Sequence, residues 1–197
     1  MGSVLSTPKT FELLIIGLDD AGKTSLVNRL KRRELPRGVL PTTTPTTGFT
    51  RETISHGQHS VTILEYSGSE KMRPLWRSCF WNAHAFVFLI DAAAPARFPE
   101  AKEELIQLIK ATSDLYPILI LANKVDLPGA VELSTIEEVF GVLGLRAAKS
   151  DRKIALKGIS AMTGEGVDEA LDWLAANLSH QVISEINEAK KQVEQSR

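Results

Sequence analysis

Cysteine and excess charge are both scarce in this sequence. Cys79 is the only cysteine among 197 residues, and one thiol cannot form a disulfide within the chain. A reducing compartment, the cytoplasm, is therefore the expected setting. The 23 Lys and Arg residues nearly balance the 24 Asp and Glu residues, so no basic excess is available to attract a nucleic acid. We expect no nucleic-acid partner.

Long hydrophobic runs are missing as well. No apolar stretch approaches the ~20 residues that span a bilayer, and the first residues lack the apolar segment of a secretory signal. Hydrophobic residues make up 43% and charged residues 24%, which is ordinary for a globular protein. A chain of 197 residues suits one domain with a sizeable core.

Short apolar runs alternate with longer amphipathic stretches. The runs predict strands at 11–17, 49–55, 61–66, 85–91, 117–123 and 153–160. The amphipathic stretches predict helices at 24–33, 99–112, 135–143 and 167–178. This alternation predicts an α/β fold, with a mostly parallel six-stranded sheet and helices on both faces. Ligands of such sheets bind beyond the carboxyl ends of the strands.

A glycine-rich loop follows the first predicted strand. Its sequence GLDDAGKT, from Gly17 to Thr24, fits the phosphate-binding pattern G-x-x-x-x-G-K-[ST]. The glycines let backbone N–H groups turn toward phosphate oxygens, and the helix that follows adds its positive N-terminal dipole. We expect Lys23 at the β- and γ-phosphates and the Thr24 hydroxyl on Mg²⁺. The residues expected around the phosphates are Gly17, Asp19, Asp20, Ala21, Gly22, Lys23, Thr24 and Ser25.

Two further loops, after the last two predicted strands, carry residues suited to guanine. The carboxylate of Asp126 in NKVD can accept two N–H bonds from guanine N1 and N2, which adenine does not offer. The stem of Lys124 can cover the base plane, and Asn123 can tie its loop to the phosphate loop. The backbone N–H of Ala161 can meet guanine O6. The residues expected at the base are Asn123, Lys124, Asp126, Ser160, Ala161 and Met162.

These motifs resemble the small GTPases, and more narrowly the Arf/Arl family. GLDDAGKTS is similar to the phosphate loop of that family, PTTGF (45–49) to its switch I, and RPLWR (73–77) to the start of its switch II helix. The resemblance covers 11–178, between a lead-in at 1–10 and a helical or frayed tail at 179–197. It implies the P-loop NTPase (small GTPase) fold and a switch that binds GTP or GDP with Mg²⁺.

The resemblance also assigns roles in the switch regions. Thr46 would ligate Mg²⁺ and sense the γ-phosphate, with Thr44 and Thr47 as alternatives in the threonine-rich run. Gly48 would be the pivot of switch I, and Gly68 would donate its N–H to the γ-phosphate. The hairpin at 50–66 would be the interswitch, which slides in register between nucleotide states in this family; an ordinary hairpin is the alternative.

The segment LEYSGSEKMRPLW (64–76) departs from the family pattern. Glu65 stands where the family has an aspartate that holds a Mg²⁺-bound water, and its longer side chain predicts weaker Mg²⁺ binding. Ser69 stands where the family has the glutamine that orients the attacking water, and a serine is too short to reach that water. Ser67 replaces a glycine and narrows the backbone choices of the switch. Glu70 is an alternative water-positioning group.

Three functions follow as hypotheses. The first is a GTP/GDP switch with impaired hydrolysis, in which the catalytic positions are Glu65, Gly68 and Ser69. The second is a nucleotide-bound interaction module that does not hydrolyse GTP. The third is a P-loop kinase or ATPase, against which NKVD counts. A switch would have effector proteins, an exchange factor and an activating protein as partners.

The family has three exposed aromatic residues on its effector surface. The matching positions here are Phe49, Leu64 and Cys79, of which only Phe49 is aromatic. Either the effector proteins differ from those of the family, or Leu64 and Cys79 are core residues.

The two ends of the chain carry further expectations. MGSVLS fits N-myristoylation at Gly2, which predicts reversible membrane contact; a vector-derived leader is the alternative. We expect the tail from His180 to be a fraying continuation of the last helix.

Overall fold

The computed structural model describes residues 9–32, 44, 46, 48–142, 144 and 152–195. Gly2 as a lipidation site, the alternative metal ligand Thr47 and the predicted helix end at Leu143 lie outside these residues. Within them, no helix is long and apolar enough to cross a bilayer.

One sheet organises the structure, with the strand order β2-β3-β1-β4-β5-β6. Its strands are β1 (Thr10–Gly17), β2 (Phe49–His56), β3 (His59–Tyr66), β4 (Ala85–Asp91), β5 (Ile118–Asn123) and β6 (Ile154–Ile159). β2 runs antiparallel to β3, and every other neighbouring pair is parallel. The predicted sheet is confirmed, and each strand boundary lies within two residues of the prediction.

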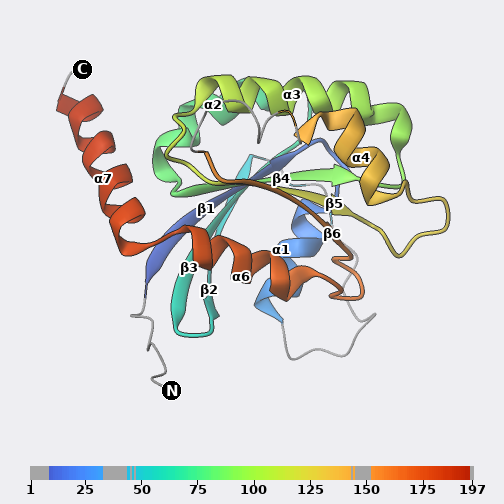
Figure 1. Ribbon diagram of the computed structural model, residues 1–197, viewed down its shortest axis with the longest axis horizontal. Helices are drawn as coiled ribbons and strands as arrows, with labels where there is room; N and C mark the ends of the chain where they lie inside the picture. Colours follow the sequence, from blue (N-terminus) through green and yellow to red (C-terminus); the bar gives the residue numbers. More distant parts are fainter. Residues whose placement is uncertain are drawn as a thin grey trace.

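Helices cover both faces of this sheet (Figure 1). α1 (Lys23–Lys31) and α6 (Val167–Asn177) lie on one face, while α2 (Trp76–Cys79) and α3 (Phe98–Ala111) lie on the other. α4 (Leu133–Phe140) contacts α3. The central strands β4 and β5 are apolar up to their last residue because both of their faces are buried between these helices.

The β2–β3 hairpin is tied to the rest of the domain at its tip. His56 Nε2 lies 2.6 Å from Asp172 Oδ1 on α6. Beside it, the Lys9 backbone N–H donates to His59 Nδ1 at 3.2 Å, and Lys9 Nζ donates to the Ala175 carbonyl at 2.9 Å. The predicted hairpin is present, held against α6; sliding of its register stays a prediction.

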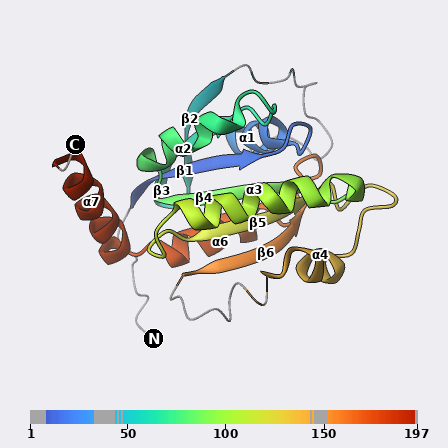
Figure 2. The same ribbon diagram turned by 90° about the horizontal axis from the view of Figure 1, so that it is seen from above.

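The C-terminal tail forms a separate helix, α7 (His180–Gln195), rather than a continuation of α6. α6 stops at Asn177, and Leu178 leaves helical geometry with φ −106° and ψ 71°. α7 lies at the end of the sheet opposite the carboxyl ends of the parallel strands, in both views (Figures 1 and 2). Ile186 is 0% exposed, and Val182 packs against the core. The prediction of a fraying continuation is wrong because the apolar stripe of the tail is buried against the domain.

A buried histidine fixes α7 to the sheet. The Glu12 backbone N–H donates to His84 Nδ1 at 3.0 Å, so the ring proton is on Nε2, which donates to Asn187 Oδ1 at 3.0 Å. Burial lowers the pKa of His84, and the positive charge of Lys190 lowers it further, against the opposing hydrogen bond of Asn187 and charge of Glu12. The native contacts therefore require the neutral ring.

We expect the free energy of unfolding to fall in acid through His84. Its pKa in the folded protein is below the unfolded value, so its contribution is fully present above about pH 6.5 and is lost as the pH falls below it. His84→Gln keeps a donor to Asn187 but does not titrate. Denaturant unfolding at pH 7.5 and 5.5 measures how much free energy of unfolding each protein loses between these two pH values. The loss in the wild type should exceed that in His84→Gln by up to about 1 kcal/mol. Equal losses would contradict this.

Candidate functional site

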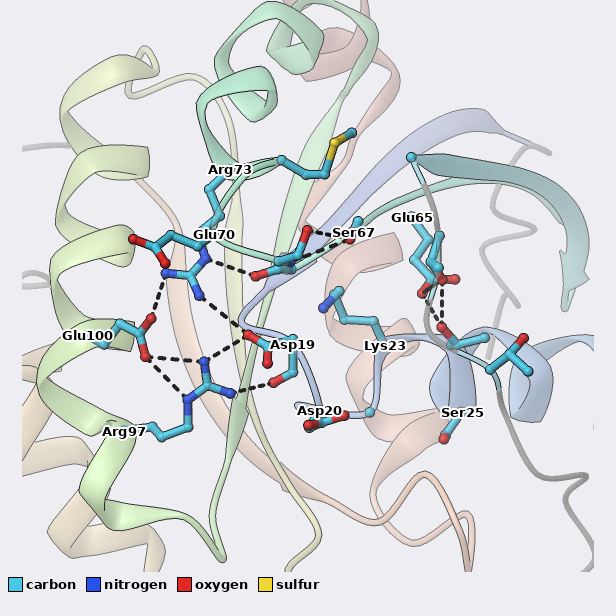
Figure 3. A pocket seen from close by; sticks show the side chains of 18 of the residues that line it. Asp19, Asp20, Lys23, Ser25, Glu65, Ser67, Glu70, Arg73, Arg97 and Glu100 are labelled. Atoms are coloured by element: carbon cyan, nitrogen blue, oxygen red, sulfur yellow. Dashed lines mark hydrogen bonds and ion pairs between the residues drawn. The ribbon is translucent and has the colours of Figure 1, made fainter.

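A cavity of about 990 Å³ lies beyond the carboxyl ends of β1 and β3 (Figure 3). The phosphate loop, the start of α1, described residues of switch I, the start of switch II and the start of α3 line it. Most predicted phosphate and metal residues meet there, namely Asp19, Asp20, Gly22, Lys23, Thr24, Ser25, Thr46, Glu65, Gly68 and Ser69.

The phosphate loop is bent tightly against its neighbours. Gly17 has φ +146°, and a Cβ there would lie 2.4 Å from the Leu89 carbonyl oxygen. Gly22 has φ +90°, and a Cβ there would lie 2.3 Å from Asn123 Nδ2. Both glycines are therefore required by conformation and by close approach.

The Lys23 ammonium is buried inside this loop. Its Nζ donates to the Gly17 carbonyl at 2.9 Å and to the Leu18 carbonyl at 2.7 Å. Burial lowers the pKa of Lys23 to about 8, an effect that the negative charge of Glu65 opposes. A buried ammonium beside a curled backbone and a helix N-terminus suits an anion such as a phosphate.

Asn123 connects three loops around this site. It is buried, and its Nδ2 donates to the Ala21 carbonyl of the phosphate loop at 2.8 Å. Its Oδ1 accepts from the backbone N–H of Ala161 at 2.9 Å. The structure thus brings together Ala21, Asn123 and Ala161, three predicted nucleotide-binding residues. The Ala161 N–H thus donates to Asn123 in this structure. The contact of the Ala161 N–H with guanine O6 stays a prediction.

The other base residues lie on the loops after β5 and β6. Lys124 lines the cavity with φ +69°, and its Nζ lies 2.6 Å from Asp91 Oδ2. Asp126 is exposed and lies outside the lining of the cavity. Arg29 of α1 holds the second loop, because it donates from Nε to the Ala161 carbonyl at 3.1 Å and also bonds Met162. No sequence motif marked Arg29 or Asp91.

Three side-chain oxygens meet next to Lys23. Thr24 Oγ1 lies 3.0 Å from Thr46 Oγ1, and both hydroxyls donate to Glu65 Oε1, Thr46 at 3.1 Å. Neighbouring ligands of an octahedral Mg²⁺, each about 2.1 Å from the ion, are about 3.0 Å apart. The spacing of the two threonines fits that requirement. Thr44 and Thr46 both line the cavity. Of these two, Thr46 is the one whose hydroxyl contacts Thr24.

Switch II begins in close contact with the phosphate loop. Gly68 accepts from the Asp19 backbone N–H at 3.2 Å, and a Cβ at Gly68 would lie 2.3 Å from that nitrogen. The Ser67 hydroxyl lies 3.2 Å from the Ser69 hydroxyl. Ser69, the residue at the glutamine position, is therefore engaged by its own neighbour.

Two arginines link the phosphate loop, switch II and α3. Arg97 Nη2 lies 2.8 Å from Asp19 Oδ1, and this hydrogen bond lowers the pKa of Asp19 against the effect of burial. The Arg73 side chain is 9% exposed, and its Nη1 lies 2.7 Å from Glu100 Oε1, while its Nε donates to the Gly68 carbonyl at 2.8 Å. Figure 3 shows this network along one side of the cavity. No sequence motif marks Arg97 or Glu100.

The three residues at the positions of the family's aromatic trio differ in their exposure. Phe49 is 58% exposed, whereas Leu64 is 5% exposed and Cys79 is half-buried against the core. Phe49 stacks on Tyr66 with ring centres 5.3 Å apart. Of the two interpretations left open by the sequence, the structure supports a core role for Leu64.

Comparisons with known proteins agree with this architecture. A solved structure of the Arl6 BBS3 small GTPase from Trypanosoma brucei, with bound nucleotide analogue GppNp, matches with a TM-score of 0.73 and 26% identity, over 85% of this chain and 96% of that one. The mammalian SRP receptor matches with a TM-score of 0.70 and 24% identity, over 85% and 100% of the two chains, which is a likeness of fold. The sequence matches the ADP-ribosylation factor family over residues 1–178. The chain belongs to the ADP-ribosylation factor family of small GTPases.

Proposed function

We propose that the protein is a GTP/GDP-dependent molecular switch whose own GTP hydrolysis is weak. One contrast carries the proposal. The groups for binding phosphate and metal, Lys23, Thr24 and Thr46, converge on one cavity, while Ser69 stands at the glutamine position and its hydroxyl lies against Ser67.

Phosphate binding follows from charge and backbone geometry. The Lys23 ammonium can leave the loop carbonyls for the β- and γ-phosphates, where a full negative charge replaces two carbonyl dipoles. The bend at Gly17 and Gly22 frees backbone N–H groups to face the same anion. The Gly68 backbone N–H would bind the γ-phosphate, and this contact would connect switch II to the nucleotide state.

Thr24 and Thr46 would hold the Mg²⁺, and Glu65 adjoins both of their hydroxyls. When bound, Mg²⁺ neutralises the negative charge on the β- and γ-phosphate oxygens. Thr46 belongs to switch I, so its hydroxyl would order that segment around a triphosphate. Phe49, exposed at the end of switch I, would then belong to the surface that effector proteins contact.

Weak hydrolysis follows from the serine at position 69. A serine is too short to orient that water from position 69, and intrinsic hydrolysis is already slow in GTPases that have the glutamine, about 10⁻⁴–10⁻³ s⁻¹. Glu70 is exposed and lies beside Arg73, away from Lys23 (Figure 3). Switching would therefore depend on an exchange factor or an activating protein. A bound-nucleotide interaction module without hydrolysis is the second candidate, on the same observation.

Asp126→Asn should change the preferred base from guanine to xanthine. An amide N–H can donate to the carbonyl that xanthine carries at C2, whereas it faces the guanine amino group without an acceptor. Competition against a fluorescent guanine nucleotide should show GDP affinity falling at least about a hundredfold and XDP affinity rising. The exposed Asp168→Asn on α6 is the matched control and should keep the wild-type preference. Unchanged GDP affinity in Asp126→Asn would contradict this.

Ser69→Gln should accelerate GTP hydrolysis. A glutamine can reach the attacking water, and the companion change Ser67→Gly frees the backbone and removes the hydroxyl that engages position 69. In single-turnover assays the double variant should hydrolyse GTP at least about tenfold faster than wild type. Ser78→Gln, at an exposed serine of α2, should have no effect. A wild-type rate equal to that of the double variant would refute impaired catalysis.

A further inference from the structure

We infer that Glu65 is a direct ligand of the bound metal ion and forms, with Thr24 and Thr46, a face of three oxygens. The inference rests on the proposed function, because the ion would arrive with the nucleotide. It differs from the outer role that the aspartate of the family pattern implies, in which the carboxylate holds a metal-bound water.

The first argument is the distance from Glu65 to the two threonines. Glu65 Oε1 lies 3.1 Å from Thr46 Oγ1 and is also in hydrogen-bond contact with Thr24 Oγ1. The two hydroxyls are themselves 3.0 Å apart. Ligands on one face of an Mg²⁺ octahedron are about 3.0 Å apart, so the spacing of Thr46 Oγ1 from Thr24 Oγ1 and from Glu65 Oε1 suits such a face. An ion placed over this face would contact Oε1 directly.

The second argument is charge. Glu65 is 1% exposed, and a buried carboxylate requires a compensating charge. Among the residues that the structure describes, its hydrogen-bond partners are the hydroxyls of Thr24, Thr46 and Thr50. The nearby Lys23 donates instead to the phosphate-loop carbonyls. A cation on the side of Oε1 would supply the charge, and each threonine oxygen keeps a lone pair for it.

The third argument is that the other carboxylate oxygen is already engaged. Thr50 Oγ1 donates to Glu65 Oε2 at 3.2 Å, and Thr50 is the residue paired with Glu65 across the β2–β3 ladder. This contact aims Oε1 at the two threonines. It also connects the metal to Thr50 of β2 through the Glu65 carboxylate. Metal binding would therefore stabilise this register of the hairpin.

Counting the water molecules on the metal tests the inference. Mn²⁺ replaces Mg²⁺ in the complex of the full chain with a non-hydrolysable GTP analogue, and line broadening of its EPR spectrum in ¹⁷O-enriched water gives the number of bound waters. Glu65→Asp shortens the side chain by one methylene and makes room for a water. Wild type should bind one water fewer than Glu65→Asp, and Glu103→Asp, at an exposed glutamate of α3 outside the cavity lining, should match wild type.

A second variant covers the case in which Glu65→Asp does not fold. Glu65→Gln keeps the shape and removes the charge of a direct ligand, so Mn²⁺ affinity of the same complex should fall at least about tenfold, with Glu103→Gln unchanged. Equal water counts in wild type and Glu65→Asp, or unchanged Mn²⁺ affinity in Glu65→Gln, would overturn direct ligation while GDP binding stands. Failure of the wild type to bind GDP in a fluorescence titration would instead overturn the proposed function, and this inference with it.

Discussion

The contact of one buried carboxylate with hydroxyls from three segments is the constraint on which this site depends. Glu65 on β3 meets Thr24 of the phosphate loop, Thr46 of switch I and Thr50 of β2. The parallel pairing of β1 with β3 sets the spacing, because it places Ile15 beside Glu65 just before the phosphate loop. Any movement of the β2–β3 hairpin would therefore break contacts at the phosphate loop, and the proposed switch would use this coupling.

Nucleotide binding and GTP hydrolysis make different demands on the site, and the proposed function would separate the two activities in this chain. Binding depends on backbone shape and charge, which the close approach of Gly68 to the phosphate loop and the ion pair of Arg97 with Asp19 maintain. Hydrolysis needs in addition one long side chain over the attacking water. The serine at position 69 is held by Ser67 within its own loop. Under the proposed function, the cavity would hold GTP while cleaving it slowly.

The sequence predicted the sheet well because strands buried on both faces have a continuous apolar pattern, as in β4. It also predicted which loops would converge, since these follow from strand direction. It did not predict the docking of α7. The apolar stripe around Ile186 is too thin to predict burial by itself, and the hydrogen bond between His84 and Asn187 joins residues far apart in the sequence. The sequence likewise did not predict the ion pair of Arg97 with Asp19. These residues are 78 positions apart, and no sequence motif contains both of them.

The rate at which a labelled, non-hydrolysable GTP analogue leaves the protein, with Mg²⁺ present and after chelation, tests the central claim most directly. If the oxygens of Thr24, Thr46 and Glu65 hold a metal that in turn holds the nucleotide, chelation should speed release at least about tenfold. Equal release rates with and without Mg²⁺ would contradict that claim. The three side chains would then be joined by hydrogen bonds alone.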